Sequence, residues 1–287
     1  MNYKSRAKAF YSISIILALL SIILLTLSFV FSFDELNGYF EDGILPILFW
    51  IVFVLGMAAP IVSALLLSKN EIIKTDDDIG KSKTGYAIFA GLLALFAIIF
   101  KIFSTSSYST TAILGACSFM LYLVLCVSSG YQYNWLKALS LLLSIIFPLA
   151  TNTENTLVLE RHSNSIENLL TSIFVISFLL YILYEGKRIF TGMHSRWHMA
   201  SMILASHTGL SISIAYVIAY GFEAVNEITR LPQIAFILII SLFIQFELFE
   251  FIRRSEAHTK EEWDALEAPN EVITEESEEA TEETINE

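Results

Sequence analysis

Long runs of apolar residues constrain the fold of this chain more than any other feature. The first follows a basic N-terminal segment and extends from Phe10 to Phe33. Seven more follow, at Ile44–Leu67, Tyr86–Phe103, Thr110–Val127, Trp135–Ala150, Leu169–Tyr184, Met199–Phe222 and Pro232–Ile252. A helix needs ~20 apolar residues to cross the ~30 Å hydrocarbon core of a bilayer. The sequence therefore predicts an all-α fold, a polytopic helical membrane bundle with about eight transmembrane helices.

The fifth and sixth runs are the shortest, so they are either less tilted helices or partly re-entrant segments. Bundles with six or seven spans therefore remain compatible with the sequence. Composition supports the membrane assignment, because 55% of the residues are hydrophobic and only 16% are charged. Soluble domains usually carry about a quarter charged residues. We expect Pro148 to disturb only the outer end of the fifth span.

Positive charges predict the orientation of the bundle. With eight spans and a cytoplasmic N-terminus, fourteen Lys and Arg residues lie on or beside the cytoplasmic segments and three lie outside. Cytoplasmic loops of membrane proteins are enriched in these residues. The sequence thus predicts a multi-pass protein of the cell (cytoplasmic) membrane with both termini in the cytoplasm.

The formal net charge of −12 is confined to the C-terminal end of the chain. Residues 255–287 hold thirteen acidic side chains and one lysine, whereas acidic and basic residues balance over 1–254. Segments so acidic and so poor in apolar residues do not bury a core. We expect a transmembrane domain over 1–254 and an acidic, largely disordered cytoplasmic tail over 255–287. The tail is either simply solvated or a docking segment for a basic protein partner.

His207 is the most deeply placed ionisable residue of the predicted spans. An ionisable residue at such depth is a functional hypothesis by default, because it must find a partner. Small residues at 201, 205, 209 and 213 predict a helix-packing ridge, and His207 lies off that ridge. It is either a neutral histidine bonded to a neighbouring helix or a ligand-binding or proton-linked residue.

Glu247 is the second candidate of this kind. It should point into the bundle, where it can pair with an arginine or a histidine. A third hypothesis is a metal site at the cytoplasmic face, built from His194, His198, Glu185 and Glu250 together with Glu247, since imidazole and carboxylate groups are common zinc ligands. Two features weigh against it. Ser195 is a preferred N-cap residue, and a helix that begins there excludes His194. Glu250 can instead pair with Arg254 four residues on.

Several functions lack support in the sequence. Nucleotide-binding, serine-hydrolase and zinc-protease motifs are absent, no cofactor is indicated, and the scattered basic residues do not favour nucleic-acid binding. A proton pathway is disfavoured because the first seven predicted spans contain no Asp or Glu. The remaining hypotheses are a membrane subunit or a carrier of a small neutral or apolar ligand through Ser/Thr-lined seams. The alternative is a membrane-embedded, metal-dependent enzyme with a cytoplasmic His/Glu site.

Overall fold

A computed structural model describes most of the chain. The described residues are 3–34, 38–66, 72–75, 83–103, 108–128, 133–150, 165–191, 195–225 and 230–258. The long helices are α1 (Tyr3–Ser32), α2 (Ile44–Leu66), α3 (Lys83–Phe103), α4 (Tyr108–Ser128), α7 (Ile166–Thr191), α8 (Arg196–Gly221) and α9 (Leu231–Arg254). A shorter helix, α5 (Asn134–Leu143), and four short strands complete the described elements: β1 (Phe33–Asp34), β2 (Tyr39–Phe40), β3 (Ile72–Thr75) and β4 (Ser255–His258).

The helices form a bundle suited to lipid. In the described residues, seven helices are long and apolar enough to cross a membrane, and one apolar helix over Asn134–Ala150 is shorter. Large apolar side chains cover the outside, with Ile16, Leu65 and Leu183 each more than half exposed. Water would penalise such a surface, whereas lipid tails do not. The structure thus supports the predicted helical bundle and a membrane location.

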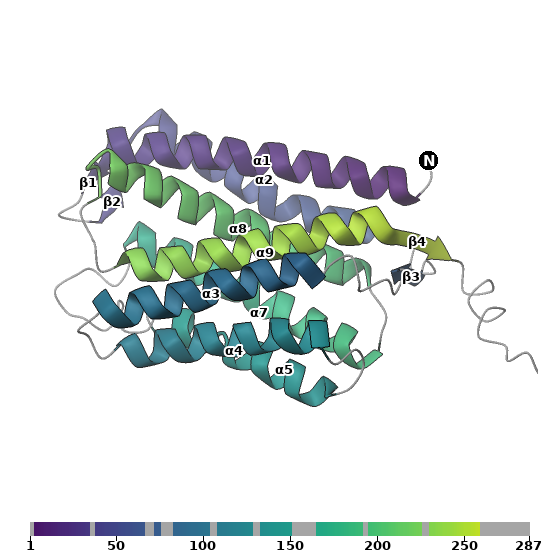
Figure 1. The fold of residues 1–287 in the computed structure, drawn as a ribbon. Helices are drawn as coiled ribbons and strands as arrows, with labels where there is room; N and C mark the ends of the chain where they lie inside the picture. Colours follow the sequence, from purple (N-terminus) through teal and green to yellow (C-terminus); the bar gives the residue numbers. More distant parts are fainter. Residues whose placement is uncertain are drawn as a thin grey trace, which may run out of the picture.

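Helix α8 lies at the centre of the arrangement. It packs against α1, α2, α7 and α9. In its most apolar stretch 72% of the residues are buried inside the bundle, compared with 11% for α3. Figure 1 shows α1 and α2 along one side of the bundle, α3, α4 and α5 along the other, and α8 and α9 between them. The predicted small-residue ridge of α8 is buried in these contacts.

The bundle has two distinct ends. Helix α1 begins and α9 ends at one of them, which we call the terminal end, and the β1–β2 hairpin marks the opposite, hairpin end (Figure 1). The backbone N–H of Ile166 donates to the Gly38 carbonyl at 2.9 Å, so α7 begins at the hairpin end. Gly38 has a φ of 72°, and a Cβ there would lie 2.9 Å from Ser165 Cβ, so this contact requires glycine.

The fifth predicted span is an interrupted helix. Helix α5 ends at Leu143, a turn covers Ser144 and Ile145, and helix resumes over 146–150. Pro148 explains the break, because a proline cannot bond the carbonyl four residues earlier, here that of Ser144, and its ring crowds that group. The expectation that Pro148 disturbs only the outer end is therefore wrong.

The sixth predicted span is longer than expected. Helix α7 covers Ile166–Thr191, so the expectation of a short or re-entrant segment over Leu169–Tyr184 is wrong. The apolar run stops at Asn168 and Glu185, but both side chains are buried inside the bundle, and the helix continues through them. Polar residues with partners do not end a membrane helix.

The last helix is followed by a strand. β4, formed by Ser255–His258, pairs antiparallel with β3, Ile72–Thr75, from the segment between α2 and α3. The first four residues of the predicted tail are thus structured at the terminal end. The remainder of that tail, 259–287, lies outside the described residues.

Candidate functional site

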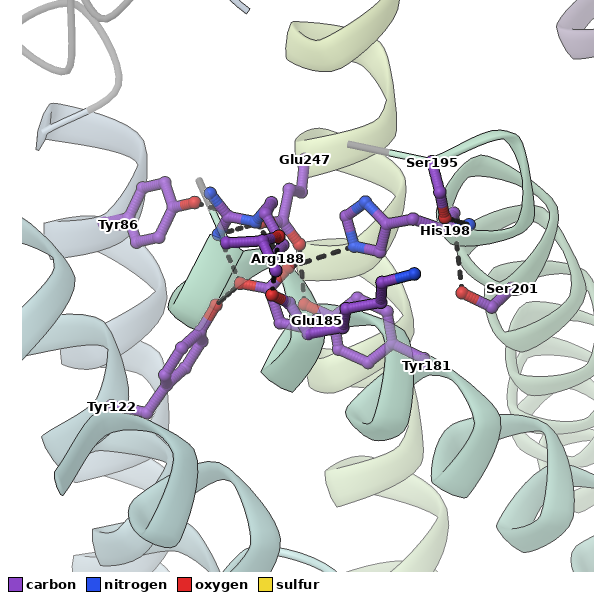
Figure 2. A network of polar contacts seen from close by, with 11 residues as sticks. Tyr86, Tyr122, Tyr181, Glu185, Arg188, Ser195, His198, Ser201 and Glu247 are labelled. Atoms are coloured by element: carbon purple, nitrogen blue, oxygen red, sulfur yellow. Dashed lines mark hydrogen bonds and ion pairs between the residues drawn. The ribbon is translucent and has the colours of Figure 1, made fainter. Parts of the chain in front are cut away.

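Seven polar side chains from five helices meet near the terminal end of the bundle. We call them the terminal cluster: Tyr86 of α3, Tyr122 of α4, Tyr181, Glu185 and Arg188 of α7, His198 of α8 and Glu247 of α9 (Figure 2). Helix α7 supplies three of them because residues 181, 185 and 188 are four and three apart, which places them on one helical face. The cluster therefore ties most of the bundle together at one point.

Glu185 is the most completely coordinated member of the cluster. The hydroxyl of Tyr122 donates to its Oε1 at 2.5 Å, and Nε2 of His198 lies 3.0 Å from its Oε2. Arg188 donates through Nε to Oε2 at 2.7 Å and through Nη2 to Oε1. The side chain is fully buried. Such two-point guanidinium pairing is among the stronger polar contacts in proteins.

Glu247 is held by different donors. Tyr181 donates to its Oε2 at 2.6 Å and Tyr86 to its Oε1 at 3.2 Å. The same Nη2 atom of Arg188 that binds Glu185 lies 3.4 Å from Oε1 of Glu247. One guanidinium is therefore shared by two carboxylates. The Arg188 side chain is 25% exposed and that of Glu247 is 8% exposed.

His198 is positioned by the start of α8. Ser195 is the N-cap, and its hydroxyl accepts the backbone N–H of His198 at 3.1 Å. The imidazole stacks on Tyr181, with ring centroids 6.2 Å apart, and meets the edge of Phe251. Helix α8 thus begins directly after Ser195, as the sequence suggested. His198 lies in its first turn and faces Glu185.

The seven side chains of the terminal cluster carry unequal formal charges. Two carboxylates face one guanidinium, so these side chains alone leave one negative charge uncompensated unless His198 is protonated. Lys137 of α5 is a further buried cation within electrostatic reach of Arg188. An uncompensated charge away from water is strongly unfavourable. Neutrality is reached when a proton resides on His198 or on one of the two carboxyl groups. The arrangement is therefore chemically suited to binding and releasing one proton.

A second buried ion pair lies at the opposite end of α7. We call it the hairpin cluster: Nη2 of Arg230 lies 3.2 Å from Oε2 of Glu167, and its Nη1 donates to Asn168 Oδ1 at 3.1 Å. Both charged side chains are at most 6% exposed. Here one carboxylate meets one guanidinium, so the charges balance.

The structure separates the residues of the metal hypothesis. His198, Glu185 and Glu247 meet in the terminal cluster, whereas Glu250 bonds Arg253 at 2.8 Å. The side chain of Arg254, the expected partner of Glu250, lies outside the described part of the structure. His194 lies outside the described residues. Within the part of the chain that the structure describes, no three His, Cys, Asp or Glu side chains are grouped to hold a metal ion. Arg188 lies between the carboxylates, where a metal would have to bind.

Sequence reasoning anticipated Glu247 inside the bundle but missed Arg188 and the three tyrosines. Arg188 was counted as a loop charge because the apolar run ends before it. A usable signal was available, since Glu185 and Arg188 continue the helical spacing of Tyr181 past Tyr184, where the apolar run ends. Glu167 and Glu185 also belong to α7, so the argument that the first seven spans carry no acidic residue no longer excludes a proton pathway.

His207 does not belong to the terminal cluster. It is buried in the middle of α8, and its ring lies against Phe53 and Gly56 of α2. The chain matches no protein-family model, and comparison with curated proteins and with solved structures finds no similar one.

Proposed function

We propose that the protein is a carrier in the cell membrane that moves a small, mostly uncharged ligand in step with a proton bound by the terminal cluster. The observation that carries this proposal is the sharing of Arg188 between Glu185 and Glu247. Ionisable residues buried in membrane bundles commonly mark proton relays or substrate pathways. Serine hydroxyls along α1 and α8 supply the weakly polar seams that an uncharged ligand requires.

The proposed orientation brings the terminal end to the cytoplasm. The excess of Lys and Arg in the segments at this end supports it. Both ends of the described chain lie at the terminal end in Figure 1, which agrees with an even number of crossings. Protons then reach the cluster from the cytoplasm through the partly exposed Arg188.

Orientation is testable with reporter fusions. Fusions at Asn37 and Asn164 should report the outside, and fusions at Asp77 and Glu287 the cytoplasm. A reporter active on only one side of the membrane, such as alkaline phosphatase, gives the readout. One reversed site would rule out the eight-crossing arrangement with both termini inside.

A proton on Glu247 would change which helices the cluster holds together. A neutral carboxyl group attracts Arg188 and accepts bonds from Tyr86 and Tyr181 less strongly than a carboxylate does. Arg188 then pairs with Glu185 alone, and α9 is held less firmly against α3 and α7. Because α9 packs along the central helix α8, this change reaches the core of the bundle. Release of the proton restores the original contacts.

The transport test uses protein in lipid vesicles with an imposed pH gradient and a trapped pH-sensitive dye. Uncharged solutes, namely polyols, amides and short-chain alcohols, are added in turn. We expect a solute that collapses the gradient with the wild-type protein and not with Glu247→Gln. Glu250→Gln is the matched control, because it changes a carboxylate of the same helix outside the cluster. Collapse that is equally fast with Glu247→Gln would contradict proton linkage through the cluster.

A further inference from the structure

A group of buried polar atoms in the middle of the bundle has no role in the terminal cluster. Both ring nitrogens of His207, and the hydroxyls of Ser21 and Ser211, make no hydrogen bond within the described part of the chain. Each of these side chains is at most 1% exposed. The Phe53 backbone is close enough to interact with His207, but without good hydrogen-bond geometry. Polar groups without partners are costly in a membrane interior.

These groups lie at a similar depth. Ser211 is four residues beyond His207, on the same side of α8. Helices α1 and α8 both run from the terminal end to the hairpin end, and Phe29 of α1 contacts Tyr216 of α8, with ring centroids 6.2 Å apart. About two turns before that contact, α1 carries Ser21 and α8 carries His207. Eleven residues separate Arg196 from His207, which places the imidazole ~17 Å along α8, near the middle of a ~30 Å hydrocarbon core.

Helix α2 adds an acceptor at the same place. Pro60 lies within α2 and has no amide hydrogen, so the carbonyl of Gly56 loses its helical partner. The His207 ring lies directly against Gly56, where any Cβ would overlap it. A carbonyl without its helical hydrogen bond and an imidazole without a partner thus adjoin in the interior of the bundle. Backbone groups freed by a proline inside a membrane helix must be satisfied by neighbouring helices, side chains or bound molecules.

The geometry points to a binding site formed by Ser21, Gly56, His207 and Ser211, the His207 site, for a small uncharged molecule that carries a hydroxyl or amide group. A neutral imidazole offers one donor and one acceptor, a serine hydroxyl offers both, and the Gly56 carbonyl accepts. A ligand with both a donor and an acceptor satisfies these groups. A charged ligand is disfavoured, because no described acidic or basic side chain contacts His207 to balance it. The role of the His207 site in holding the carried ligand rests on the proposed function, but ligand binding to this site can be measured without transport.

The test uses nuclear magnetic resonance of the full chain with isotope-labelled histidine rings, and acetamide as the probe. His207→Asn identifies the His207 resonances by their loss. We expect acetamide to shift these resonances saturably and to leave those of His198 unchanged. Acetate, similar in size but charged, should have no effect. Absence of a saturable His207 shift with acetamide, or an equal shift with acetate, would overturn the assignment.

Two variants refine the test. Ser211→Ala should weaken acetamide binding about fivefold, as expected for one lost hydrogen bond. Gly56→Ala should abolish the shift because its methyl group takes the place of the ring, whereas Gly91→Ala, with nothing within 4 Å of the added atom, should not. If Gly56→Ala does not fold, the Ser211→Ala result still decides, and unchanged binding there would overturn the proposed site. Saturable acetamide binding to a protein that collapses no pH gradient would refute the proton linkage and leave this site in place, so the two failures are distinguishable.

Discussion

The two ends of α7 each hold a buried ion pair, but with different charge balance. At the hairpin end, one carboxylate, Glu167, meets one guanidinium, Arg230. At the terminal end, Glu185 and Glu247 share Arg188, and His198 touches one of the two carboxylates. The balanced pair is suited to joining helices and has no reason to take up a proton. The unbalanced cluster also joins helices, and in addition it can bind one proton.

The largest effect should come from the balanced pair. Glu167→Gln removes the carboxylate that pairs with the buried guanidinium of Arg230, and breaking a buried ion pair should cost about 3–5 kcal/mol of unfolding free energy. Denaturant-induced unfolding of the purified protein, followed by tryptophan fluorescence, measures the loss. The double variant Glu167→Gln with Arg230→Met should recover a large part of it. A loss below ~1 kcal/mol for the single variant would show that the pair is not buried as described.

Glu247→Gln should lower the unfolding free energy much less than Glu167→Gln does. Arg188 keeps Glu185 as its partner, and the glutamine amide still accepts a bond from Tyr181, so the loss should stay within about 1 kcal/mol. The same unfolding experiment compares the two carboxyl replacements directly. Equal losses for Glu167→Gln and Glu247→Gln would remove the distinction between the two clusters.

Tyr181→Phe should have an intermediate effect. It removes a hydroxyl that donates to Glu247 at 2.6 Å, and hydrogen bonds to charged groups contribute about 1.5–3 kcal/mol. Tyr184→Phe, a half-buried tyrosine of the same helix outside the cluster, is the control. If both variants unfold at the same denaturant concentration, the Glu247 carboxylate does not depend on this donor.

A small loss of stability should also follow from removing the N-cap of α8. Ser195→Ala removes the acceptor for the His198 backbone N–H, which should cost about 1 kcal/mol. Because the cap also directs His198 toward Glu185, the ring resonance of His198 should move. An unchanged resonance together with lowered stability would mean that the cap acts on the helix alone.

Sequence reasoning reached the bundle because bilayer thickness sets the length of an apolar helix. It placed Glu247 inside because that residue sits within an apolar run. It ended the sixth span too early, since a hydropathy window treats Glu185 and Arg188 as loop residues although they are satisfied inside the bundle. Tyr122 carried no signal at all, because its contact with Glu185 joins residues that are distant in sequence. Contacts of that kind depend on how helices pack, not on local pattern.

The central claim is that the terminal cluster holds one exchangeable proton. Infrared difference spectroscopy of the protein in lipid, recorded across a pH titration, detects protonated carboxyl groups through their C=O stretch. The account predicts that one component of the carboxyl band, separate from the bands of the other acidic residues, appears reversibly on acidification in the wild type and in Glu250→Gln and is lost in Glu247→Gln. A band that persists unchanged in Glu247→Gln, or disappears in Glu250→Gln, would contradict it.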